Sequence, residues 1–177
     1  MVIVCQECKA EFDHEPITVN GREMFRPKFC DACSEAQEAR QAASEREARV
    51  SMRKAEWERI CPPLYRETDI SRIPTVFRTV IAGWKFNPTG LGLVGEAGQC
   101  KTRAAFLILK AQHFAGRRVF AASANKMGAW AQSRFSDDPE RKAAAFRGLQ
   151  DLRRADVVLI DDLGKKKMTE TVEEEFF

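Results

Sequence analysis

Four of the six cysteines form two pairs near the N-terminus, Cys5 with Cys8 and Cys30 with Cys33. Two residues separate the members of each pair, so one tight turn can present both thiolates to the same ion. Two such turns complete a tetrahedral Zn²⁺ site, and four thiolate ligands leave no open position for a catalytic water. The alternative is that the cysteines remain reduced or form disulfides. His14 lies between the pairs and is expected at the surface, because the four cysteines already complete the coordination shell.

A second group of residues could hold phosphate groups. In the loop pattern G-x-x-x-x-G-K-[ST], backbone N–H groups surround the phosphates, the lysine reaches the outer ones and the Ser or Thr holds Mg²⁺. Residues 95–102 read Gly95, Glu96, Ala97, Gly98, Gln99, Cys100, Lys101 and Thr102. The segment departs from the pattern at Cys100, where glycine is usual. If that position needs a positive φ, the Cβ atom costs about 1 kcal/mol or somewhat more. If the position is already helical, cysteine is small enough to fit with little strain, so the departure is tolerable in either case. We therefore predict an ATP-binding loop in which Lys101 is catalytic and Thr102 binds magnesium.

Two acidic residues, Asp161 and Asp162, directly follow the apolar run at residues 157–160. At the end of a buried strand, Asp161 would hold Mg²⁺, mostly through water, and Asp162 would orient or activate the attacking water. For the two acids taken alone, the alternative is a helix-capping turn. The two acids come after the glycine loop, and predicted helices separate the two motifs. In this order the acids predict the part of an ATPase site that binds Mg²⁺.

Residues 61–177 alternate apolar runs with amphipathic stretches, and this alternation must position both motifs. The pattern predicts strand-like segments at 91–94, 118–122 and 157–160. It predicts helices at 102–115, 126–135 and 139–154, with a further helix from Thr169. Such alternation is typical of α/β proteins, in which helices cover both faces of a parallel sheet.

The N-terminal part reads as two further regions. Asn20 and Gly21, flanked by strand-forming residues, indicate a hairpin between the cysteine pairs, so residues 1–33 are predicted to be a zinc ribbon. About 33 residues bury too little core to fold without a metal. Residues 34–60 are predicted to be a charged helical linker with Ser34 as N-cap. Apolar residues at seven-residue spacing form a weak seam there: either the helix is solvated, or it packs on a neighbour.

The bulk properties describe an ordinary globular chain. It has 177 residues, a hydrophobic content of 44% and a net charge of +3. The charge permits contact with nucleic acid without arguing for it. No apolar run reaches the length of a membrane span, and the N-terminus does not read as a secretory signal, so we expect a cytoplasmic protein that does not contact a membrane.

Three motifs together resemble the DnaC/IstB-type AAA+ ATPases, which include bacterial and phage helicase loaders. They are the run from Trp84 to Gly95, the segment from Gly98 to Arg103 and the segment from Leu159 to Gly164. The resemblance covers residues 60–177 and implies a P-loop NTPase fold, ATP with Mg²⁺, a replicative helicase as partner, possible single-stranded DNA binding and possible homo-oligomers. A transposition helper ATPase, or a zinc-ribbon adaptor with a vestigial ATPase, are the alternatives.

The resemblance also implies features beyond residue 177. A fourth strand with a polar sensor residue would lie between the loop strand and the Asp161 strand, and arginine fingers would follow it. We therefore expect an incomplete parallel sheet, the N-terminal part of an ATPase core with weak or no turnover. Candidate DNA contacts, which are more often a solvated surface, are Arg134, Arg153, Arg154, Lys165, Lys166 and Lys167.

Overall fold

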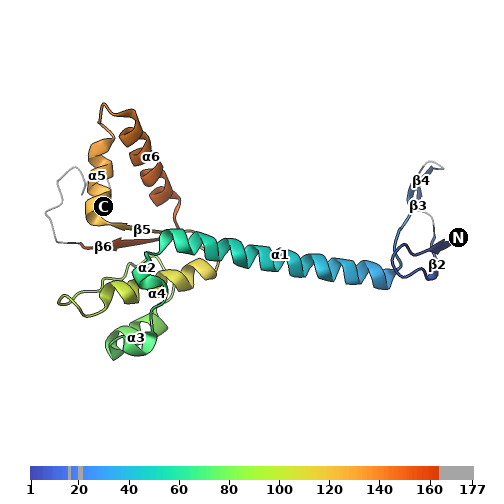
Figure 1. Ribbon diagram of the computed structural model, residues 1–177, viewed down its shortest axis with the longest axis horizontal. Coiled ribbons are helices and arrows are strands. Elements are labelled where there is room, and N and C mark those ends of the chain that lie inside the picture. Colours follow the sequence, from blue (N-terminus) through green and yellow to red (C-terminus); the bar gives the residue numbers. More distant parts are fainter. Residues whose placement is uncertain (16, 20–21, 164–177) are drawn as a thin grey trace. The chain divides into compact units, whose positions relative to one another are not determined.

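The computed structural model describes residues 1–15, 17–19 and 22–163 (Figure 1). The chain divides into two compact units, Met1–Met52 and Arg53–Phe177. The division falls inside the long helix α1 (Asp31–Ile60), so the last two turns of this helix belong to the second unit. No helix of the described residues is long and apolar enough to cross a membrane.

The first unit contains two small antiparallel sheets. Strand β1 (Val2–Val4) pairs with β2 (Glu11–Asp13), and β3 (Ile17–Val19) pairs with β4 (Arg22–Phe25). The second pair confirms the hairpin predicted between the cysteine pairs, although its turn at residues 20–21 lies outside the described residues. The first pair was not predicted, because three-residue strands are too short to show an apolar–polar alternation.

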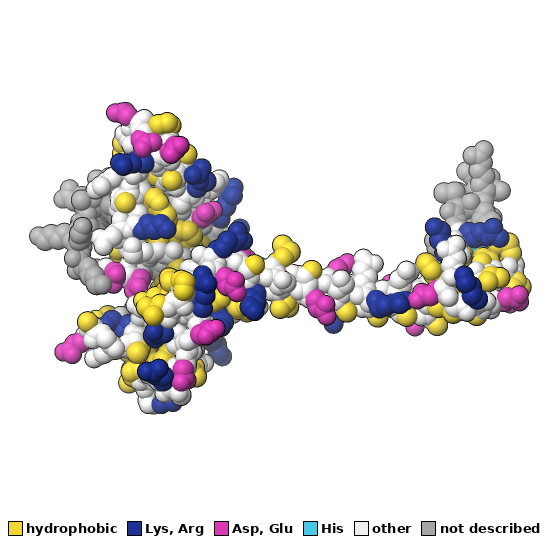
Figure 2. Space-filling model, in the orientation of Figure 1, with side chains coloured by type: hydrophobic (Ala, Val, Ile, Leu, Met, Phe, Trp, Pro, Cys, Tyr) yellow, Lys and Arg dark blue, Asp and Glu magenta, His cyan; other side chains and the backbone are white. Residues whose placement is uncertain are grey.

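Helix α1 begins three residues earlier than predicted. Its first residue is Asp31, and the backbone N–H of Ser34 donates a hydrogen bond of 2.9 Å to the carbonyl of Cys30. The prediction that Ser34 is the N-cap is therefore wrong, because Ser34 already lies in the first helical turn. Side chains from 35 to 52 are all exposed, as a solvated helix requires, whereas Trp57 is buried. Figure 2 shows side chains of both charge signs along this helix.

The second unit contains a pair of parallel strands and several helices. Strands β5 (Val119–Ser123) and β6 (Val157–Asp161) pair in parallel, with Ser123 opposite Asp161. The helices are α2 (Pro63–Arg66), α3 (Thr75–Gly83), α4 (Lys101–Phe114), α5 (Ala124–Ser133) and α6 (Pro139–Arg154), and a short 3-10 turn spans Ile70–Arg72. Helix α4 contacts both strands and α5 contacts β5 (Figure 1). From α4 to β6, the order of these elements matches the predicted alternation of helix and strand.

One predicted strand is missing from this unit. Residues 91–94 are not assigned to a strand, and most of their side chains are exposed, with Val94 at 90%. A strand requires ladder hydrogen bonds to a neighbouring strand. Among the described residues, the sheet of this unit consists of β5 and β6 alone. The apolar composition of 91–94 was therefore insufficient to predict a strand. The helix predicted from Thr169 lies outside the described residues.

Helix α4 is held by two apolar clusters. On one side, Trp57 and Cys61 at the end of α1 pack with Phe106, Leu109 and Val119. On the other side, Ile73 and Phe77 from the α3 region pack against Ala104. Because this helix packs in both clusters, its N-terminal end has a defined position beside the end of β6.

Candidate functional sites

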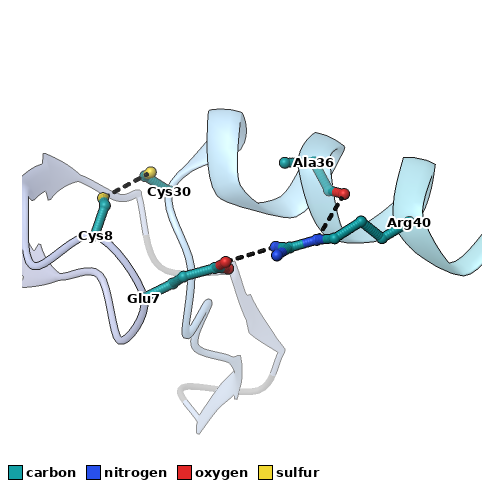
Figure 3. Close-up of polar contacts among 5 residues, drawn as sticks. All are labelled: Glu7, Cys8, Cys30, Ala36 and Arg40. Atoms are coloured by element: carbon teal, nitrogen blue, oxygen red, sulfur yellow. Dashed lines mark hydrogen bonds and ion pairs between the residues drawn. The ribbon is translucent and has the colours of Figure 1, made fainter.

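The four paired cysteines come together in the first unit. The Sγ atoms of Cys5, Cys8, Cys30 and Cys33 all lie within 4.8 Å of one another, and Cys8 Sγ is 3.7 Å from Cys30 Sγ (Figure 3). A tetrahedral ion with Zn–S bonds of about 2.3 Å separates its sulfur ligands by about 3.8 Å. All four cysteines are free thiols, not disulfides. The cluster could therefore hold one metal ion, and its size and donor set are compatible with zinc.

Backbone hydrogen bonds shape the first turn of this cluster. The N–H of Cys5 donates to Ala10 O at 2.9 Å, and the N–H of Lys9 donates to Cys5 O at 3.1 Å. Lys9 has a φ of 62°, which lets the chain reverse directly after Cys8. The N–H of Gln6 donates to Lys28 O at 2.9 Å, and this bond ties the first turn to the segment that leads into the second cysteine pair.

The thiols of the cluster differ in acidity. Burial raises the pKa of Cys5, but hydrogen bonds from the backbone N–H groups of Cys30, Cys8 and Glu7 outweigh burial and lower it to about 6. Hydrogen bonds with the thiols of Cys8 and Cys30 raise the pKa of Cys33 to about 12. Four thiols this close cannot all ionise without a counter-charge. A divalent cation supplies that charge, so the cluster favours metal binding over four free thiolates.

An ion pair connects the metal cluster to the third turn of α1. The guanidinium of Arg40 donates to the carboxylate of Glu7 and, through Nε, to the carbonyl of Ala36 at 3.3 Å (Figure 3). Glu7 lies in the turn between Cys5 and Cys8. The sequence does not predict this pair, because no local pattern relates residues that are 33 positions apart.

The glycine loop leads directly into α4, whose first residue is Lys101. Cys100 precedes it with φ 60° and ψ 18°, in the left-handed region where glycine is favoured. Gly98 also has a positive φ, of 82°. The position of Cys100 therefore has a positive φ, and its Cβ atom adds strain there.

The end of β6 lies beside the start of α4. Thr102 Oγ1 donates to Asp161 Oδ1 at 3.1 Å, and both residues are half-buried. Asp162 follows with a φ of 60° and an exposed side chain. The ammonium of Lys101 donates to the carbonyl of Glu96, so it turns back over the loop.

These residues share one open cavity of about 900 Å³. Every predicted nucleotide-site residue except Glu96 lines it, namely Gly95, Ala97, Gly98, Gln99, Cys100, Lys101, Thr102, Asp161 and Asp162. Tyr65, Trp84 and Phe86 add aromatic rings to the lining of this cavity, and the sequence did not predict them there. Trp84 begins one of the three motifs quoted above, but no pattern in the sequence indicated that these three rings would line the site, because aromatic residues are at least as common in cores. The cavity is large enough for a nucleotide, and polar groups of the loop and of the end of β6 contribute to its lining.

Two of the three described arginines predicted as DNA contacts lie at a smaller hollow. Arg134 and Arg153 line a cavity of about 320 Å³ together with Phe146 and Arg147. Arg154 does not line it. The lysines at 165–167 lie outside the described residues.

No family model, curated protein or solved structure matches this chain. The cysteine cluster has the donor atoms and spacing of a metal site. The cavity at the start of α4 combines backbone N–H groups, an ammonium, a hydroxyl and two carboxylates at one end.

Proposed function

We propose that this protein binds ATP with Mg²⁺, with residues 95–102 as the phosphate loop. The contact between Thr102 and Asp161 carries this proposal. A hydroxyl and a carboxylate 3.1 Å apart, at the start of a helix and the end of a strand, are the two groups that a phosphate-loop ATPase uses on its magnesium ion. Their contact places both oxygens at one point of the cavity.

The other groups of the cavity support the same chemistry. The N-terminus of α4 directs free N–H groups and the positive end of its dipole at the loop. Lys101 exchanges the Glu96 carbonyl for the outer phosphates when the nucleotide binds. Asp162, exposed beside Asp161, orients or activates the attacking water.

We propose further that hydrolysis by this chain alone is slow. An arginine finger contributes about 10³-fold or more to phosphoryl transfer. Among the described residues that line the cavity, the only arginine is Arg103. Its guanidinium donates to Leu64 O at 2.9 Å and lies over the ring of Tyr65, so it is already engaged. Fast turnover by the purified chain would contradict this part of the proposal.

At the level of biology, we propose a DnaC/IstB-type AAA+ ATPase that acts in DNA replication. The three motifs quoted above support it, with the cysteine cluster as a zinc ribbon that contacts a replicative helicase. Single-stranded DNA and further copies of the chain are proposed as additional partners. A transposition helper would share the same ATP site, and only its protein partner would distinguish it.

ATP binding by the full chain tests the proposal directly. With Mg²⁺ present, the protein should bind ATP, and Lys101→Ala should abolish most of the binding. Lys142→Ala, which removes an exposed lysine of α6 away from the cavity, serves as the matched control and should bind as the unmodified protein does. Equal binding by Lys101→Ala would refute the phosphate-loop assignment. The adaptor with a vestigial ATPase would then be the better explanation.

The identity of the metal needs its own measurement. We propose that the ion is Zn²⁺, because four thiolates in a tetrahedron are the donor set of structural zinc sites. Metal analysis of the purified protein should find one zinc per chain. Cys30→Ser should lose it, whereas Cys61→Ser, at a buried cysteine outside the cluster, should retain it.

A further inference from the structure

The metal cluster and the start of α1 are built from the same residues. Cys33 lies in the first helical turn, and Cys30 directly precedes Asp31, the first residue of the helix. The Cys30 carbonyl accepts the N–H of Ser34 at 2.9 Å, so it forms the first helical hydrogen bond. A metal ion held by these two thiolates would therefore fix the backbone of the first turn of the helix. Fixing that turn is the costly step of helix formation.

The helix beyond this turn has little else to hold it. All side chains from 35 to 52 are exposed, so no apolar burial stabilises this segment. Its own contacts are local, such as the amide of Gln41 donating to Glu45 at 3.0 Å. The Arg40–Glu7 pair is an additional support, and it joins the helix to the turn between Cys5 and Cys8. That support depends on the metal cluster as well.

The last turns of the same helix are held differently. His113 Nε2 is 2.8 Å from the carbonyl of Arg53, and the guanidinium of Arg53 donates to the carbonyl of His113. Trp57 is buried against Phe106. These contacts lie within the second unit and involve no cysteine of the cluster. Helical structure at residues 53–60 is therefore independent of the metal.

We propose that metal binding by the four cysteines controls whether residues 34–52 are helical. With the ion bound, the first turn is formed, and helical structure extends into residues 34–52 both from that turn and from the docked residues 53–60. Without the ion, helical structure is supported only at the docked residues 53–60, and the helix frays from its N-terminal end. Residues 34–52 thus act as a metal-dependent conformational switch. This inference rests on the metal site and is independent of the nucleotide proposal.

Amide hydrogen exchange of the full chain, with one equivalent of Zn²⁺ or with excess chelator, tests the inference. The amides of 35–50 should lose protection in the chelator, and those of 57–60 should keep it. Unchanged protection of 35–50 in a chain shown to have lost its zinc would overturn the inference. A chain that binds no zinc at all would also overturn it, because the premise would fail.

Coupling of this kind is reciprocal, so weakening the helix must weaken metal binding. Ala43 is exposed and ten residues past Cys33, and Ala43→Gly lowers helix propensity without touching the cluster. We expect its Zn²⁺ affinity, measured by competition with a chromogenic chelator, to fall about two- to fivefold. The matched control is Ala144→Gly, at an exposed position of α6. Equal zinc affinities of the two variants would overturn the coupling.

Discussion

The hydroxyl of Thr102 lies 3.1 Å from the carboxylate of Asp161, although 59 positions separate the two residues in the chain. One residue is in the first turn of α4 and the other ends β6. The clusters around Phe106 and Ala104 position the helix beside the strand. The contact between Thr102 and Asp161 therefore depends on the packing of α4 against β6.

If the two residues share a magnesium ion, Asp161→Asn should weaken Mg²⁺-dependent ATP binding by about 10- to 100-fold. That range corresponds to the loss of about 1.5–3 kcal/mol for a polar contact to a charged group. Titration calorimetry with and without Mg²⁺ measures the difference. Asp151→Asn, at an exposed position of α6, is the control and should bind ATP normally. The assignment is wrong if Asp161→Asn shows the same Mg²⁺ dependence as the unmodified chain.

Cys100 has the left-handed backbone that glycine adopts without strain. Cys100→Gly should therefore raise the free energy of unfolding, by about 0.5–1 kcal/mol after allowing for the larger entropy of glycine in the unfolded chain. Cys100→Ala keeps the Cβ atom and should give no such gain. Chemical denaturation distinguishes the two variants. A gain in Cys100→Ala equal to that in Cys100→Gly would show that the thiol, not the backbone, is the source of strain.

Arg118 and Asp156 clamp the starts of the two parallel strands. The backbone N–H of Arg118 donates to Asp156 Oδ2 at 2.8 Å, and its guanidinium donates to Oδ1 at 2.9 Å. These hydrogen bonds lower the pKa of Asp156 below its ordinary value of 3.8. The clamp is therefore present above pH 3.8 and is lost as the pH falls further and the carboxylate is protonated.

Asp156→Asn should accordingly be less stable than the unmodified chain at neutral pH, and the difference should shrink below about pH 4. Thermal unfolding measured from pH 3 to pH 7 gives this comparison. Because both side chains are partly exposed, the effect should also decrease in high salt. A difference that stays constant across this pH range would mean that the carboxylate charge contributes nothing.

Gly148 permits α6 to pack on α5. A Cβ atom built at this glycine would lie 2.5 Å from the indole of Trp130, closer than packed atoms can approach. Gly148→Ala should force the ring to move and destabilise the second unit by about 1–3 kcal/mol. Gly83→Ala is the control, because a Cβ atom there meets nothing within 4 Å. Equal stability of the two variants would mean that the indole has room to shift.

Features that depend on local spacing could be predicted well from the sequence. Pro139 and Arg154 bound α6 as predicted, because Asp138 caps the helix and Pro139 suits its first turn. The Cys5–Cys8 and Cys30–Cys33 spacings correctly indicated one cluster, because each pair can occupy a single turn. Each of these features is encoded within a few consecutive residues.

Features that depend on a residue distant in the chain could not be predicted from local spacing. An apolar run at 91–94 predicted a strand, but strand formation depends on a neighbour that supplies hydrogen bonds. The linker helix was predicted to be solvated or packed, and the structure makes residues 35–52 exposed while burying Trp57. The ion pair of Glu7 with Arg40 had no sequence signal at all.

The sequence by itself therefore determined the donor atoms of both candidate sites: four thiols at zinc spacing, and a lysine, a hydroxyl and two carboxylates in the order that predicts an ATPase. Only the tertiary structure decided that Thr102 meets Asp161, that Cys100 takes a left-handed backbone, and that the metal cluster shares its residues with the start of α1. The physical reason is that residue types are local, whereas distances between them depend on packing and backbone torsions summed over the whole chain.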